Sequence, residues 1–230
     1  DEAKNYFTRV KVLVLRPYFP FYKKKTAKNE LKNYTYENIE VIYCNYLYFP
    51  IWPFIKYRGL VAYIFNSKNV KKLIDKSYCI HANFTSPAGV FASYLCNSLK
   101  MNYTLTVHED HNWLMDEIKS NNRLLISAWK NAKTIIRVND FDSKELRAYN
   151  NNVITIPNGY NHRKFKRLDK RDCRLKLGYS LNDKIIINIG FYNDQKNQKL
   201  LIDSINLLTD DVKKNLTCII LGGGPKENVL

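Results

Sequence analysis

Short apolar runs alternate with amphipathic segments along almost the whole chain, and this alternation restricts the fold more than any other feature. Runs rich in β-branched residues, such as 10–15, 103–107 and 134–138, are separated by segments with helical spacing, such as 87–99. Strands that are joined through helices are parallel, and helices cover both faces of a parallel sheet. The sequence therefore predicts an α/β protein built from Rossmann-like, doubly wound sheets.

The other elements can be placed from the same pattern. Residues 16–38 show no sustained period and are expected to form a loop, or a loop with a short helix. Further strands are expected at 39–43, 77–82, 153–156, 185–189 and 216–221, and further helices at 60–76, 124–132, 143–149 and 199–208.

One stretch, Ile156-Pro157-Asn158-Gly159, divides the chain into two halves. Proline fixes φ, and an Asn-Gly pair tolerates the positive φ of a tight turn, so the stretch ends one strand-helix series before another begins. We predict an interdomain hinge there. It would join a domain at 1–160 to a domain at 161–230, with the functional site in the cleft that the two domains face.

The second of these domains is short. After the hinge the sequence holds one strand-helix-strand unit and the start of another helix, whereas a doubly wound domain usually has ~100–150 residues. We therefore expect the second domain to be incomplete and the chain to be a fragment of a longer protein.

Polar side chains follow the strands of the first half, where a parallel sheet binds its ligands. His81 lies in the strand expected at 77–82, and His108-Glu109-Asp110-His111 follows the strand at 103–107. A histidine at a strand end is more often structural than catalytic, which is our interpretation of His81. His108 is the better candidate, and we interpret Glu109, Asp110 and His111 as polar loop residues.

In the second half, glycines follow both predicted strands. Gly190 ends the first strand, and Lys196 lies at the start of the next helix, an arrangement that suits a phosphate group. The run 222–225 (Gly-Gly-Gly-Pro) follows the second strand. Neither segment is a P-loop, which needs Gly-Lys-Ser/Thr, and the glycine run does not fit a dinucleotide fingerprint.

Four stretches, in order, resemble the retaining family 4 glycosyltransferases, which have two Rossmann-like domains in the arrangement called the B fold. They are 80–89 (Ile-His-Ala-Asn-Phe-Thr-Ser-Pro-Ala-Gly), 106–108 (Thr-Val-His), 156–159 with Phe165, and the segment from 189 to 225 that contains Gln195-Lys196-Asn197. The Glu-x₇-Glu motif that holds the donor sugar in that family would lie beyond Leu230.

The resemblance implies that a hexose is transferred, with retention, from a nucleotide-sugar donor to a glycan or lipid-linked acceptor. The N-terminal domain would hold the acceptor and the C-terminal domain the donor. No metal or other cofactor would be needed, because basic side chains and helix N-termini neutralise the diphosphate. The family often has Gly-Arg after the first strand of the second domain, whereas this chain has Gly190-Phe191.

The same resemblance assigns roles to single residues. His108 would contact the sugar or the transition state in the cleft. Lys196, beside Gly190, would stabilise the leaving diphosphate. Two further pairs would have backbone roles: Gly223 and Gly224 would let the chain approach the nucleotide, and Asn158 and Gly159 would shape the hinge side of the cleft.

The net charge of +16 is concentrated in three segments, 23–32, 68–72 and 163–176. Such basic fields attract nucleotide phosphates, anionic membrane surfaces or nucleic acid, although a solvated surface is the simpler interpretation of any one of them. The five cysteines are widely spaced and show no metal-ligand pattern, which favours a reducing compartment. We expect a cytoplasmic protein at the membrane surface.

Two other functions are compatible with the sequence. The chain could be a truncated, catalytically inactive fragment, or a basic module that binds nucleic acid or another anion. No known nucleic-acid motif is present, so a nucleic-acid partner is not expected.

Overall fold

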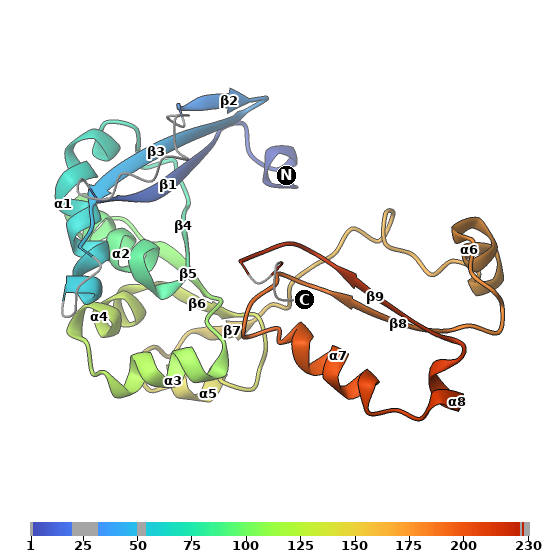
Figure 1. The fold of residues 1–230 in the computed structure, drawn as a ribbon. Helices are drawn as coiled ribbons and strands as arrows, with labels where there is room; N and C mark the ends of the chain where they lie inside the picture. Colours follow the sequence, from blue (N-terminus) through green and yellow to red (C-terminus); the bar gives the residue numbers. More distant parts are fainter. Residues whose placement is uncertain (1, 20–31, 50–53, 226, 228–230) are drawn as a thin grey trace. The chain divides into compact units, whose positions relative to one another are not determined.

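The computed structural model describes residues 2–19, 32–49, 54–225 and 227, and it divides into two compact units, Asp1–Gly159 and Tyr160–Leu230 (Figure 1). The basic residues 23–25 and 28 lie outside the described residues. Each unit has its own parallel strands. Within the described ranges, no helix combines the length and the apolar character that crossing a bilayer requires.

The first unit begins with a three-stranded sheet in the order β1-β3-β2, preceded by a 3₁₀ turn, η1 (Glu2–Asn5). Strands β1 (Val10–Tyr18) and β3 (Ile39–Leu47) are parallel over their full length, and β2 (Tyr34–Tyr36) pairs with β3 in the antiparallel direction. The expectation of a loop over 16–38 is thus wrong at both ends. Pairing with β3 extends β1 through Tyr18, and the alternating Tyr34-Thr35-Tyr36 forms an edge strand.

Helix α1 (Arg58–Lys71) follows a 3₁₀ turn, η2 (Phe54–Tyr57), and covers this first sheet. Ala62 and Val70 of α1 are buried against Ile42, Cys44 and Tyr46 of β3. Helix α2 (Val90–Leu99) contributes its own apolar side chains to the same cluster. The period-2 pattern of the strand and the 3.6-residue pattern of the helix therefore meet in one core.

A four-stranded parallel sheet forms the rest of the first unit, in the order β4-β5-β6-β7 (Figure 1). Its strands are β4 (Ile80–Asn83), β5 (Tyr103–Val107), β6 (Thr134–Arg137) and β7 (Val153–Thr155). Helices α2 and α4 (Arg123–Asn131) bury their apolar faces against it, with Leu105, Trp129 and Ile135 fully enclosed.

The connections of this sheet carry the polar segments that follow the strands. A single π-helical turn, η3 (Thr85–Gly89), follows β4. Helix α3 (His111–Lys119) follows β5, and a short helix, α5 (Ser143–Arg147), follows β6. Helix α3 was not predicted. Its N-cap is Asp110, whose carboxylate accepts the Trp113 N–H at 2.9 Å, so part of the expected polar loop is the start of a helix.

The second unit contains one parallel pair, β8 (Lys184–Ile189) and β9 (Leu216–Leu221), in register over six residues. Helix α7 (Gln198–Asn206) and a short helix, α8 (Asp210–Lys213), connect them. A further helix, α6 (Lys170–Leu177), lies in the basic segment, where no element was predicted. Asp169 caps its start and Gly178, with φ of 78°, ends it.

Candidate functional site

The first group of polar side chains lies at the carboxyl ends of β4 and β5. The Asn83 side-chain oxygen lies 3.1 Å from Nε2 of His108, which can donate to it, and the His108 ring lies 5.1 Å from the Phe84 ring between centroids. His108 is half-buried, so one edge of a fixed imidazole reaches the surface at this point. An imidazole held in this way can contact a bound ligand without first losing conformational entropy.

His81 lies in β4, the strand next to β5, and its imidazole has a hydrogen-bond partner of its own. Its Nε2 is 2.8 Å from Oγ1 of Thr106. Burial, and to a smaller extent the charge of His108, lower the pKa of His81. The bond to Thr106 is compatible with the structural role of His81 that the sequence suggested, and that role stays a prediction.

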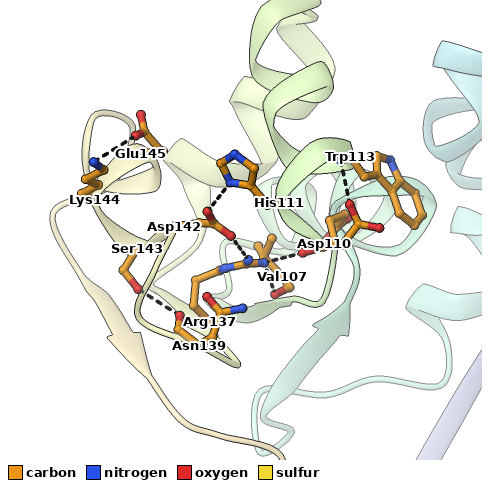
Figure 2. Close-up of polar contacts among 11 residues, drawn as sticks. Val107, Asp110, His111, Trp113, Arg137, Asn139, Asp142, Ser143, Lys144 and Glu145 are labelled. Atoms are coloured by element: carbon orange, nitrogen blue, oxygen red, sulfur yellow. Dashed lines mark hydrogen bonds and ion pairs between the residues drawn. The ribbon is translucent and has the colours of Figure 1, made fainter. Parts of the chain in front are cut away.

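A second group joins the ends of β5 and β6 through one buried arginine (Figure 2). Arg137 donates from Nη1 to the carbonyl oxygens of Val107 and Glu109, at 2.8 and 2.9 Å, and from Nη2 to Oδ2 of Asp142 at 2.7 Å. Nδ1 of His111 lies 2.6 Å from the other oxygen of Asp142. Because a carboxylate only accepts, Nδ1 carries the proton and Nε2 of His111 is the basic nitrogen.

A third group consists of two buried carboxyl groups. Glu109 lies in the loop between β5 and α3, as expected, but it is only 1% exposed, and its Oε1 accepts the Thr85 N–H at 2.6 Å. Glu117 of α3 is buried as well. Burial, followed by the negative charge of Glu109, raises the pKa of Glu117 to about 8, against the opposing effect of Arg58.

In the second unit, the predicted phosphate residues meet where β8 ends. A Cβ added at Gly190 would lie 3.6 Å from Cγ of Lys196, so the lysine stem passes over this glycine. The Lys196 N–H donates to Oδ1 of Asn193 at 2.9 Å, and Asn197 caps α7 by accepting the Leu200 N–H. The loop is thus fixed by its asparagines, and it places a lysine beside the N-terminus of α7.

Two of the glycines after β9 are required by packing. A Cβ on Gly222 would lie 1.9 Å from the Gly190 carbonyl oxygen, and a Cβ on Gly224 would lie 2.7 Å from that of Tyr192. Gly223 differs, because its added Cβ would meet nothing within 4 Å. The absence of a side chain at Gly224 is therefore explained by its contact with Tyr192, and no ligand is needed to account for it.

Asn158 and Gly159 end the first unit in an exposed stretch without regular structure. Neither is among the described residues with positive φ, so the tight turn expected from the Asn-Gly pair is not formed. Pro157 already separates the two strand-helix series, and the chain leaves β7 extended. The role of the stretch as a hinge stays a prediction.

Comparison with known proteins finds a relative by sequence similarity. Over 155 residues, the chain is 24% identical to TuaC of Bacillus subtilis (strain 168), a protein assigned to teichuronic acid biosynthesis as a glycosyltransferase. The match covers 66% of the chain but only 39% of TuaC. No protein-family model matches the sequence.

A solved structure supports the fold. The crystal structure of an α,α-trehalose-phosphate synthase (UDP-forming) from Burkholderia vietnamiensis superposes with a TM-score of 0.54 at 11% identity. The superposition covers 96% of this chain and 65% of the synthase. The predicted α/β fold with Rossmann-like units is therefore confirmed, and the likeness at this identity concerns the fold alone.

The sequence reasoning missed Arg58, Glu117 and the Arg137–Asp142 pair. One signal for Arg137 was present, because a charged residue inside the apolar strand 134–138 has to find a partner when it is buried. Arg58 and Glu117 had no comparable signal, since the first opens one helix and the second belongs to a helix that was not predicted.

Proposed function

We propose that the chain is part of a retaining glycosyltransferase, which moves a hexose from a nucleotide-sugar donor to a glycan or lipid-linked acceptor. The observation that carries this proposal is the sequence similarity to the glycosyltransferase TuaC, and the shared fold of a second glycosyl-transferring enzyme is consistent with it. In this proposal the first unit holds the acceptor and the second unit holds the donor.

The donor diphosphate would bind at the ends of β8 and β9. Lys196 is exposed, its backbone is held by Asn193, and the first N–H groups of α7 lie next to it in the chain. The full charge of Lys196 and the partial positive charge of the helix N-terminus thus lie at one place. Together they favour binding of a diphosphate and stabilise it further when it becomes the leaving group. We propose that these groups replace a metal ion, with Gly190 and Gly223 leaving room for the nucleotide.

His108 would act on the sugar from the first unit. Its ring is held by Asn83 and Phe84, and it lies at the strand ends where parallel sheets bind ligands. A fixed donor or acceptor of hydrogen bonds at the reacting sugar stabilises the transition state more than the ground state if it is aligned with the developing charge.

We further propose a cytoplasmic enzyme that works at the membrane surface on an envelope polysaccharide. The name of TuaC refers to teichuronic acid biosynthesis, and the net charge of +16 favours contact with anionic lipids. An acceptor that is linked to a lipid would itself be held at the membrane surface.

The test is transfer from a panel of nucleotide-hexoses, with release of the nucleoside diphosphate and the anomeric configuration of the product as readouts. His108→Ala and Lys196→Ala are each expected to lower turnover about 100-fold, and EDTA is expected to leave it unchanged. His162→Ala and Lys214→Ala, both at exposed positions, are the matched controls.

Wild-type turnover in His108→Ala and Lys196→Ala would contradict the assigned roles. If the chain neither binds nor consumes any nucleotide-hexose, the alternative of an inactive fragment is favoured. Binding to RNA or DNA that exceeds nucleotide-sugar binding and falls steeply with salt would favour a nucleic-acid module.

A further inference from the structure

A pocket of about 700 Å³ opens in the first unit between the start of α1 and the helices α3 and α4. This volume is in the range of small-molecule sites. Its lining combines charged groups of both signs with an indole ring: Lys56, Arg58, Arg123, Asp116, Glu117 and Trp113. None of these residues has a role in the proposed donor site.

Arg58 is held in position by one residue. Its Nε donates to Oγ of Ser86 at 3.1 Å, and its Nη2 donates to the Ser86 carbonyl oxygen at 2.8 Å. Among the described residues, no acceptor is recorded for Nη1. A guanidinium group that is fixed on one edge and open on another is well suited to bind a carboxylate or a phosphate.

Glu117 lies at the pocket, and the protein uses only part of its hydrogen-bonding capacity. The side chain is 8% exposed, and within the described part of the chain its Oε2 has no partner. Oε2 of Glu109 is also buried without a partner there. Buried polar atoms are nearly always paired, so an unpaired one beside a cavity indicates a ligand or a water molecule.

The charge of the pocket depends on Glu117. Its pKa of about 8 means that the carboxyl is mostly protonated at pH 7 and can donate a hydrogen bond. The pocket lining then carries three cations, Lys56, Arg58 and Arg123, and one anion, Asp116; with the neighbouring Glu109 carboxylate counted as well, the sum is 3 − 2 = +1. A neutral ligand would leave this excess charge uncompensated, whereas an anionic ligand would balance part of it.

We propose that this pocket binds a sugar that carries one anionic substituent, either a carboxylate or a phosphate. The anion pairs with Arg58, a ring hydroxyl bonds to Glu117, and the apolar face of the ring packs on Trp113. Trp113 is suited to this because its ring is stacked on Phe84, with centroids 6.1 Å apart, and is therefore held in place. Flat aromatic surfaces next to a few polar groups are the usual composition of such sites.

Binding of the sugar needs no assumption about catalysis. If the chain also transfers a hexose, this pocket is the acceptor subsite and the acceptor is an acidic glycan; this second statement rests on the proposed function. Binding is therefore measured without a donor, so that failure of glycosyl transfer and failure of the pocket assignment give different results.

The experiment titrates the full chain at pH 7 with D-glucuronate, D-glucose 6-phosphate and D-glucose, and follows binding by calorimetry and ligand-observed NMR. At least one anionic sugar is expected to bind tenfold or more tightly than glucose. Preference for glucuronate identifies a carboxylate ligand, and preference for the phosphate identifies a phosphorylated one. Equal binding of all three sugars, or no binding, would overturn the proposal.

Variants locate the site. Arg58→Gln is expected to weaken binding of the anionic sugar at least tenfold, and Lys119→Gln, an exposed cation of α3 that does not line the pocket, is the matched control. Unchanged affinity in a folded Arg58→Gln protein would overturn the assignment. Should that variant not fold, Arg123→Gln is tested against the same control and is expected to weaken binding as well.

The pH dependence separates a ligand-binding role from a merely structural one. Glu117 faces Arg58, Glu109 and Trp113, and Asp116 and Lys56 line the same pocket. Ionisation of Glu117 adds a negative charge, so affinity for the anionic sugar is expected to fall severalfold from pH 7 to pH 9. Glu117→Gln, which mimics the protonated group, is expected to abolish this decrease, and a decrease that persists in the variant would overturn the role of Glu117.

Discussion

Arg137 and Asp142 form a buried ion pair, with Nη2 of the guanidinium 2.7 Å from Oδ2 of the carboxylate. The same guanidinium binds the carbonyl oxygens of Val107 and Glu109, so the loop after β6 is fastened to the end of β5. His111, in the first turn of α3, contacts the other oxygen of the Asp142 carboxylate (Figure 2). One side chain thus organises three of the segments that carry candidate site residues.

Replacement of Arg137 by methionine is expected to destabilise the first unit strongly. The variant leaves the Asp142 carboxylate buried without its cation, which typically costs about 3–5 kcal/mol. Urea unfolding followed by tryptophan fluorescence measures this loss in the first unit, because all three tryptophans lie before residue 160. A double variant, Arg137→Met with Asp142→Leu, is expected to recover part of the loss, and an unchanged midpoint in Arg137→Met would contradict the role of the pair.

Replacement of His111 by glutamine is expected to change stability by less than about 1 kcal/mol. The side chain is half exposed, and exposed ion pairs contribute little. Asp142 also keeps its bond to Arg137 in this variant. The same urea titration tests the prediction, and a loss as large as that of Arg137→Met would show that the histidine is the main partner of the carboxylate.

Glu117→Gln is expected to stabilise the protein increasingly as the pH rises from about 4.5 to 8. The folded-state pKa is raised from 4.5 to about 8, so the folded protein binds more protons than the unfolded chain over this range. Wild-type stability then falls with pH, by at most about 1.4 kcal/mol for each pH unit from this one group. Above the folded pKa the difference between the two proteins becomes constant.

Unfolding free energies of wild type and Glu117→Gln at pH 5, 6, 7 and 8 test this prediction. Glu145→Gln, at a half-exposed glutamate of α5, is the matched control and should follow the wild-type curve. A constant difference between Glu117→Gln and wild type across these four values would contradict the raised pKa.

Alanine substitutions in the glycine run are expected to have unequal effects on the second unit. Gly222→Ala and Gly224→Ala each force a methyl group against backbone atoms of residues 190–192, and overpacking of this kind costs about 1–3 kcal/mol. Gly223→Ala has open space and is expected to be tolerated. Thermal unfolding of the three variants, followed by hydrogen exchange in β8 and β9, compares them, and equal losses would contradict the packing argument.

Local sequence patterns were enough where the element carries a clear period. The strands β5 and β9 begin and end at the predicted residues, because each is a compact β-rich run bounded by polar residues or glycine. Helix α3 was missed because its start lies among His, Glu and Asp residues that are typical of loops. The Asp110 cap was the available signal, since Asp before a helical segment is a common start.

The candidate sites depended on contacts that no local pattern contains. His108 could be selected because it directly follows a strand, which is a position rule for parallel sheets. The pocket could not be predicted, because Arg58, Ser86 and Glu117 come from three separate segments that meet only after folding. The raised pKa of Glu117 likewise depends on Glu109 and on burial, both of which are tertiary effects.

The open space at Gly223 has a practical consequence. A side chain on either neighbouring glycine would collide with backbone atoms. A side chain at Gly223 would instead extend freely from the loop after β9. A cysteine introduced there, labelled with a fluorophore, would give a reporter that leaves the surrounding backbone undisturbed. Occupancy of the proposed nucleotide site next to Lys196 could then be followed in real time, independently of any turnover.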